Sequence, residues 1–178
     1  EKWDKQLLKL AQHFWPGPLT LLLEKKSLIP DLVTSGLPRV AFRVPSHPII
    51  RAVLNQISFP LAAPSANPFG YISPTSAQHV EKQLGSQLEY IVDGGLCKHG
   101  LESTIVGIED DKITIYRQGA IPQEDIESLL QTNVITKQQD TSPDAPGMIK
   151  KHYAPRTTFV AKENFKIKNE NENLAVLN

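Results

Sequence analysis

Short helical and strand-like segments alternate along this chain, and the alternation constrains its fold more than any other feature. Lys2 to Phe14 carries apolar side chains at helical spacing, whereas Leu19 to Glu24 and Val40 to Val44 are short, largely apolar strand-like runs. Pro48 to Gln56 again predicts a helix, with Ser46 as its N-cap. Helices that alternate with strands are typical of a sheet covered by helices. The sequence therefore predicts an α/β fold.

The second half of the chain continues the pattern. Its predicted elements are two short buried strands, a β-hairpin and a closing helix that follows Pro122. They are Ile57 to Ala63, Tyr90 to Val92, the strands Ser103 to Ile108 and Lys112 to Arg117 around Glu109-Asp110-Asp111, and Gln123 to Leu130.

Residues 64–75 run from a predicted strand end through a polar turn into a predicted helix, Pro74 to Leu84. Ser73 is the expected N-cap and Pro74 the first helical residue. Unpaired N–H groups at a helix start, with serine and threonine hydroxyls beside them, suit a phosphate. An ordinary capped helix that binds nothing is the alternative for this stretch taken alone.

Six segments of the chain together resemble the YrdC-like family of threonylcarbamoyl-AMP synthases, which start the threonylcarbamoyladenosine modification of tRNA. The resemblance covers roughly residues 3–160, with the segments in the expected order. They are Phe14-Trp15-Pro16-Gly17-Pro18-Leu19-Thr20, Val40-Ala41-Phe42-Arg43-Val44-Pro45 with His47-Pro48, Ser65-Ala66-Asn67 with Ser73-Pro74-Thr75, Glu102-Ser103-Thr104-Ile105-Val106, Arg117-Gln118-Gly119, and Pro146-Gly147-Met148 to His152-Tyr153-Ala154-Pro155.

The resemblance implies a YrdC-like twisted mixed sheet with flanking helices, followed by a linker and the start of a second domain. We expect a catalytic domain over residues 1–131, an interdomain linker over 132–155 and the beginning of a C-terminal domain over 156–178. The family's opening strand and turn, with a Thr/Tyr-rich pocket and a Lys-x-Arg pair, has no counterpart here. We therefore expect an N-terminally incomplete piece of a two-domain member.

The implied reaction joins L-threonine, bicarbonate and ATP into threonylcarbamoyl-AMP, with pyrophosphate and water as the other products. The family's chemistry needs Mg²⁺ on the ATP phosphates and no covalent intermediate with the protein, because positioning and charge neutralisation suffice for an in-line attack on phosphorus. The product would pass to the machinery that transfers threonylcarbamoyl to tRNA. RNA contact is a further expectation.

Matching the family pattern position by position gives two sets of candidate contacts. For ATP they are Ser65, Asn67, Ser73 and Arg117, together with Arg39, which stands where some relatives have a small hydroxyl residue. For L-threonine they are Arg43, Ala63 through its backbone, and Ser103. Taken without the family, a solvated arginine on the strand face is the favoured interpretation of Arg43, and a surface arginine is the alternative for Arg117. Thr20 is interpreted as structural.

His152 and Tyr153 lie in a polar segment bounded by prolines. By resemblance to two-domain relatives, the pair is expected to fold over the mouth of the active site and exclude water from a labile product. A passive tether whose tyrosine packs on the surface is the alternative.

Several function classes are excluded or left unsupported. The formal net charge is zero, which argues against coating nucleic acid through bulk electrostatics. No Cys/His spacing predicts a metal site, and the single Cys97 excludes an internal disulfide. No apolar run is long enough to span a bilayer, so a cytoplasmic protein is expected.

Two alternatives to the synthase stay open. One is a YrdC-like module that binds RNA or nucleotide without turnover, and the other is the YrdC-like domain of a hydrogenase-maturation carbamoyltransferase. A requirement for L-threonine separates them from the synthase.

Overall fold

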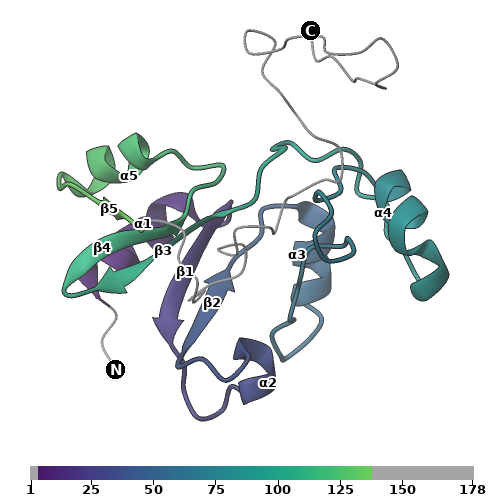
Figure 1. Cartoon of the computed structure of the whole chain (residues 1–178), viewed down its shortest axis with the longest axis horizontal. Coiled ribbons are helices and arrows are strands. Elements are labelled where there is room, and N and C mark those ends of the chain that lie inside the picture. The colour runs from purple at the N-terminus through teal and green to yellow at the C-terminus, as the bar shows by residue number, and fades with distance from the viewer. Residues whose placement is uncertain (1–3, 138–178) are drawn as a thin grey trace, which may run out of the picture.

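The computed structural model describes residues 4–137, in which five strands form one mixed sheet with flanking helices (Figure 1). This confirms the predicted α/β class. The strand order is β2-β1-β3-β4-β5. The strands are β1 Leu19–Glu24, β2 Arg39–Arg43, β3 Thr104–Glu109, β4 Lys112–Arg117 and β5 Ile135–Thr136. The helices are α1 Lys5–Phe14, α2 Asp31–Thr34, α3 Pro48–Leu54, α4 Ala77–Leu84 and α5 Gln123–Leu130, with a 3₁₀ turn, η1, at Gly85–Gln87.

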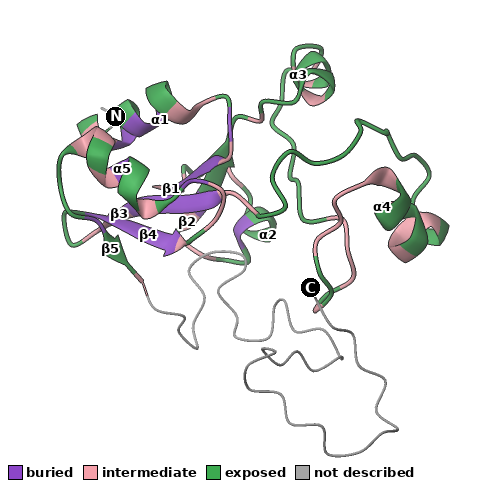
Figure 2. Cartoon of the chain, turned by 90° about the horizontal axis from the view of Figure 1, so that it is seen from above, coloured by how far each residue is buried: buried purple, intermediate pink, exposed green. Residues whose placement is uncertain are grey.

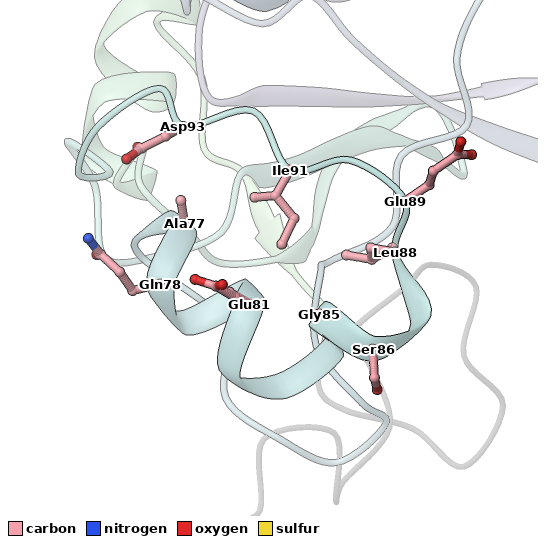
Figure 3. A pocket seen from close by; sticks show the side chains of 9 residues that line it. All are labelled: Ala77, Gln78, Glu81, Gly85, Ser86, Leu88, Glu89, Ile91 and Asp93. Atoms are coloured by element: carbon pink, nitrogen blue, oxygen red, sulfur yellow. The ribbon is translucent and has the colours of Figure 1, made fainter.

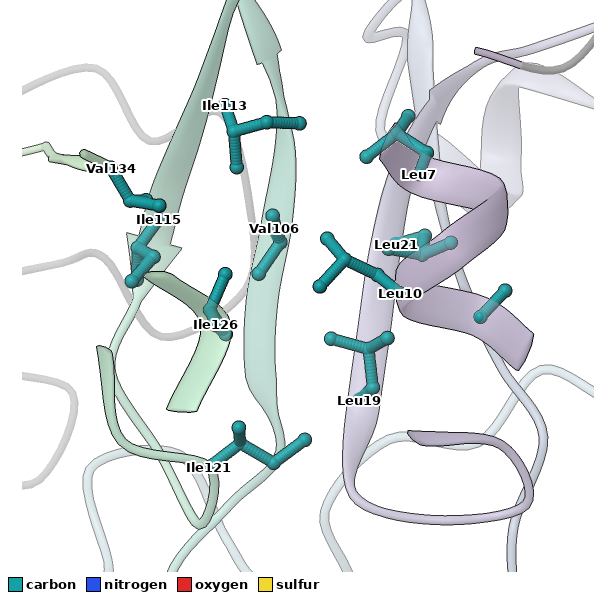
Figure 4. Close-up of a cluster of buried hydrophobic side chains, with 11 residues drawn as sticks. Leu7, Leu10, Leu19, Leu21, Val106, Ile113, Ile115, Ile121, Ile126 and Val134 are labelled. Carbon is teal, nitrogen blue, oxygen red and sulfur yellow. The ribbon is translucent and has the colours of Figure 1, made fainter. Parts of the chain in front are cut away.

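The main core lies between one face of the sheet and the helices α1 and α5 (Figure 4). Leu10 of α1 and Ile126 of α5 are fully buried there, against Leu21 of β1 and Ile115 of β4. Alternate residues of each strand face the helices because side chains alternate across a sheet. A smaller buried cluster of Leu22, Ile105 and Tyr116 lies on the other face.

The predicted hairpin is confirmed. Strands β3 and β4 pair antiparallel from Glu109 opposite Lys112, so the turn holds only Asp110 and Asp111. Both residues have positive φ, 48° and 58°, as a type I′ turn requires. Aspartate tolerates this conformation better than most residues.

Three predicted helix boundaries are wrong. Helix α4 begins at Ala77, with Ser76 as the cap, because the Ser73 hydroxyl donates to Glu102 instead of capping a helix. Helix α3 ends at Leu54 and is capped by His47, whose Nδ1 accepts from the backbone N–H of Ile49 at 3.3 Å. Helix α1 begins after Asp4, whose carboxylate accepts two backbone N–H groups.

The predicted strands Ile57 to Ala63 and Tyr90 to Val92 do not form. A strand needs a hydrogen-bonding neighbour, and neither segment pairs with an edge of the described sheet. In the described chain no residue between Val40 and Thr104 is buried, as the green and pink ribbon in Figure 2 shows. The apolar residues of these two segments therefore predicted buried strands, but in the structure the segments are not buried.

Sequence patterns missed α2, η1 and β5, which are two to four residues long. Strand β5 lies within the stretch assigned to the linker and pairs parallel to β4, with Thr114 opposite Ile135. Residues 156–178, assigned to a second domain, lie outside the described part of the chain.

Thr104 gives a first test of this packing. It is completely buried, and its Oγ1 donates to Ile121 O at 2.7 Å and accepts from Ile121 N at 3.0 Å. Thr104→Val keeps the shape but leaves two buried backbone groups unpaired, so urea unfolding should show a loss of about 2 to 3 kcal/mol. Thr114→Val is the control, since the Thr114 hydroxyl makes only a long 3.3 Å bond within its own strand. Equal losses in both variants would contradict the role of the Thr104 hydroxyl.

Candidate active site

The sheet topology brings four polar residues to one end of neighbouring strands. Strands β1 and β3 run parallel and begin there, while β2 and β4 run antiparallel to them and end there. Thr20 and Ser103 therefore lie at strand starts, and Arg43 and Arg117 at strand ends. Thr20 is directly opposite Arg43 in the β1–β2 register, so their side chains share one face of the sheet.

Thr20, Ser103 and Arg117 form a hydrogen-bonded group, which we call the strand-end cluster. Thr20 Oγ1 and Ser103 Oγ lie 2.7 Å apart. Arg117 donates to the Ser103 carbonyl oxygen from Nε at 3.2 Å and from Nη2 at 2.9 Å, and Nη2 lies 3.1 Å from Ser103 Oγ. The guanidinium thus fixes both the backbone and the side chain of Ser103.

The residues that flank Ser103 and Arg117 hold the cluster in place. The backbone N–H of Ala120 donates to Glu102 O at 2.9 Å. At Gly119 an added Cβ would lie 2.4 Å from Glu102 O and 2.6 Å from the Ser103 carbonyl carbon. Only glycine permits this approach of one backbone to another.

Ser73 reaches this region through Glu102. Its Oγ donates to Glu102 Oε1 at 2.6 Å, which joins the loop of residues 64–75 to the start of β3. Of the residues predicted to contact ATP, Ser73 and Arg117 are thus brought together through the Glu102-Ser103 dipeptide.

The other predicted loop residues make none of the hydrogen bonds of the cluster described above. Ser65 and Ala63 are exposed. Asn67 uses its amide nitrogen to bind the carbonyl oxygens of Pro68 and Tyr71, at 3.0 and 3.1 Å. Its Oδ1 is buried without a hydrogen-bond partner. Asn67 therefore shapes its own turn.

Arg39 is placed differently from the other candidates. It lies at the start of β2, the end opposite to Arg43, and donates to the hydroxyl of Tyr116. Its guanidinium carbon is 5.0 Å from the centre of that ring, and Lys137 Nζ is 5.3 Å from the same centre. Lys137 also pairs with Glu109 at 3.0 Å. The structure does not bring Arg39 to the strand-end cluster.

Tyr116 makes the stability of the protein depend on pH. Burial raises the pKa of its hydroxyl above the ordinary value of 10.0, although the hydrogen bond and charge of Arg39 act in the opposite direction. A raised pKa in the folded state favours the protonated form, so this contribution is complete below about pH 10 and is lost as the pH rises through the folded pKa.

Tyr116→Phe removes that titration. The free energy of unfolding, measured with urea from about pH 8 to about pH 11, should fall more steeply above pH 10 for the wild type than for the variant. Subtracting the two curves isolates the contribution of the Tyr116 hydroxyl, because the substitution removes only that group. A difference that stays constant over the range would contradict the account.

A pocket of about 660 Å³ lies elsewhere, between α4, η1 and the following segment (Figure 3). Its charged lining groups are Glu81, Glu89 and Asp93, with no basic side chain among the lining residues. Such a surface repels a polyphosphate. The pocket therefore does not suit ATP.

Other kinds of site are not found in residues 4–137. No group of three or more His, Cys, Asp or Glu side chains in this part could hold a metal ion. Cys97 is an exposed free thiol. No helix among the described residues is long and apolar enough to cross a membrane. His152 and Tyr153 lie outside the described residues.

Sequence reasoning missed two residues of the site. Thr20 was interpreted as structural, which its burial fits, but its bond to Ser103 also makes it part of the strand-end cluster. Glu102 was taken only as part of a motif. The strand register, which places Thr20 beside Arg43, is the signal that would have found Thr20.

Comparison with known proteins assigns the chain to a family. A family model for Sua5, YciO and YrdC proteins, described as "Telomere recombination", matches residues 1–119. The chain belongs to the Sua5/YciO/YrdC family. A second model, "Threonylcarbamoyl-AMP synthase, C-terminal domain", matches residues 121–178.

Members of this family with curated names are similar over most of the chain. The threonylcarbamoyl-AMP synthase of Pyrococcus abyssi is 41% identical over 159 residues, which are 86% of this chain and 46% of that protein. The Bacillus subtilis synthase is 42% identical over 150 residues, 82% of this chain and 43% of that protein. The chain thus spans about half the length of the curated relatives it matches.

A crystal structure of P. abyssi Sua5 in complex with L-threonine has the same fold. It superposes with a TM-score of 0.82 at 38% identity and covers 87% of this chain and 47% of that one. The mixed sheet and flanking helices described above are therefore the Sua5/YrdC architecture.

Proposed function

We propose that this chain supplies part of the active site of a threonylcarbamoyl-AMP synthase, which joins L-threonine, bicarbonate and ATP. The observation that carries this proposal is the strand-end cluster, in which Arg117, Ser103 and Thr20 are hydrogen-bonded beside Arg43. Two guanidinium groups and two hydroxyls suit one carboxylate and one polyphosphate. The relative solved with L-threonine supports the same substrate here.

Each residue has a distinct role in the proposed reaction. Arg43 is exposed at the end of β2 and would bind the carboxylate of L-threonine, with Ser103 and the Ala63 backbone beside it. Arg117 would face the ATP phosphates, joined by Ser73 and, further along the loop, Ser65 and Asn67. We leave Arg39 out of the ATP site because it binds Tyr116.

The proposed reaction proceeds without a covalent link between substrate and protein. The amine of L-threonine takes up carbon dioxide from bicarbonate, with release of water, and becomes a carbamate. A carbamate oxygen attacks the α-phosphorus of ATP, and the bond to pyrophosphate breaks. The protein's part is to align the two substrates and to offset negative charge as pyrophosphate leaves.

Mg²⁺ would arrive on the ATP phosphates rather than on a cage of protein ligands. The strand-end cluster contains a guanidinium group, which suits phosphate oxygens and repels a metal ion, and no carboxylate. When bound, the ion would offset phosphate charge.

The match of residues 121–178 to a synthase C-terminal domain favours a synthase over a carbamoyltransferase. A binding module without turnover is the second candidate, and its loop serines would hold nucleotide without a need for L-threonine. The proposal also includes a cytoplasmic location and contact with RNA. It further includes passage of the product to the tRNA-modifying machinery and closure of His152 and Tyr153 over the site.

Release of pyrophosphate tests the proposal. The chain is mixed with ATP, Mg²⁺ and bicarbonate, with L-threonine or with D-threonine as the matched control. We expect release that depends on the L-isomer. Release that does not depend on threonine, or none at all, would contradict the proposed activity for this chain.

A further inference from the structure

Two adjacent residues, Glu102 and Ser103, connect the two substrate sides of the proposed site. Glu102 Oε1 accepts a 2.6 Å hydrogen bond from Ser73 Oγ, on the loop proposed for ATP. The next residue, Ser103, is proposed to contact L-threonine and makes the bonds to Thr20 and Arg117. Two adjacent residues thus contact both sides.

The backbone that carries this carboxylate has little freedom to move. Glu102 O accepts the N–H of Ala120, Ser103 O accepts two N–H groups of Arg117, and Gly119 packs directly against both carbonyls. Both Glu102 and Ser73 are half-buried. The side chain of Glu102 is therefore a short, well-anchored connection to the loop.

The direction of the hydrogen bond determines what Ser73 can offer to an anion. A serine hydroxyl has one hydrogen, and a carboxylate or phosphate oxygen only accepts. While Ser73 donates to Glu102, it presents lone pairs to a phosphate, and the carboxylate adds like charge nearby. Binding of phosphate requires the Ser73 hydrogen to turn away from Glu102.

We propose that Glu102 is a positioning residue that holds Ser73 against the start of β3 and sets the affinity of this loop for ATP. This role rests on the proposed function, because ATP is the anion in question. The hydrogen bond keeps the loop in place, and the same bond occupies the donor that a phosphate needs. Removing the charge and removing the contact should therefore have opposite effects.

Calorimetric titration of MgATP into the wild type, Glu102→Gln and Glu102→Ala tests this role. The glutamine amide can donate to Ser73 Oγ, which frees the serine hydrogen for phosphate and removes the negative charge. We expect ATP to bind Glu102→Gln about tenfold more tightly than the wild type, the size of one charge-assisted hydrogen bond. Glu102→Ala leaves the loop without this contact, and we expect about tenfold weaker binding.

A second pair of variants links the effect to Ser73. In a Ser73→Ala background the Glu102→Gln substitution should tighten binding less than in the wild type, because the freed hydrogen is absent and only the loss of the negative charge remains. Thermal melting of every variant tests whether each is folded.

Two results would overturn the role of Glu102. Equal weakening of ATP binding by Glu102→Gln and Glu102→Ala would show that Glu102 gives structural support only. A tightening of the same size with and without the Ser73 hydroxyl would exclude the role of the Ser73 hydrogen. Failure of the wild type to bind ATP would overturn the proposed function itself, and the role of Glu102 with it.

Discussion

Gly119→Ala should destabilise the protein and distort the strand-end cluster. The new Cβ would lie 2.4 Å from Glu102 O, 2.6 Å from the Ser103 carbonyl carbon and 2.7 Å from Ser103 O. All three are backbone atoms, so no side chain can rotate away and the start of β3 must shift. We expect a loss of about 2 to 3 kcal/mol in the free energy of unfolding and a melting temperature about 5 to 10 °C lower.

Gly100→Ala is the matched control for this substitution. No atom lies within 4 Å of its added Cβ, and its φ lies outside the range that side chains rarely adopt. Its melting temperature should equal that of the wild type. A Gly119→Ala protein as stable as Gly100→Ala would show that the two backbones do not approach as described.

Arg117→Ala should have the largest effect on activity. It removes the two bonds to Ser103 O and the contact with Ser103 Oγ, and it also removes the charge proposed to face the phosphates. We expect threonine-dependent release of pyrophosphate to fall about 100-fold or more, as when a charge-stabilising donor is lost elsewhere.

Arg117→Lys separates charge from geometry, because lysine keeps the charge but cannot place two donors on one carbonyl oxygen. An intermediate loss is expected. Arg51→Ala, on the exposed surface of α3, controls for loss of a positive charge at a distance. An Arg117→Ala protein with the activity of Arg51→Ala would exclude the proposed role.

The parts of the fold that local sequence determines were predicted well. Strand β1 has the predicted bounds, and so does α5, which begins directly after Pro122. The hairpin was predictable because Asp110 and Asp111 can adopt the positive φ of a two-residue turn. In each case a local conformational preference and the burial pattern agree.

Prediction failed where the outcome depends on contacts distant in sequence. Ile57 to Ala63 has the composition of a buried strand but no strand partner in the described sheet. Ser73 was predicted to be a helix cap, but its hydroxyl donates a hydrogen bond to the carboxylate of Glu102, 29 residues away. Neither result is visible in a local pattern.

In the candidate site, too, the residues that carry a motif could be predicted, whereas contacts between distant residues could not. Arg43, Ser103 and Arg117 could be named from motifs, and the sheet topology places them at one end of the strands. Arg39 was assigned to ATP by its position in the motif, and its side chain contacts the hydroxyl and ring of Tyr116, 77 residues away.

Calorimetric titration of MgATP with and without saturating L-threonine tests the central claim most directly, with Arg117→Ala as the comparison. If the strand-end cluster binds both substrates, L-threonine should tighten the binding of ATP, and Arg117→Ala should abolish that enhancement. Binding of ATP that is the same with and without L-threonine, or an enhancement that survives in Arg117→Ala, would contradict the account.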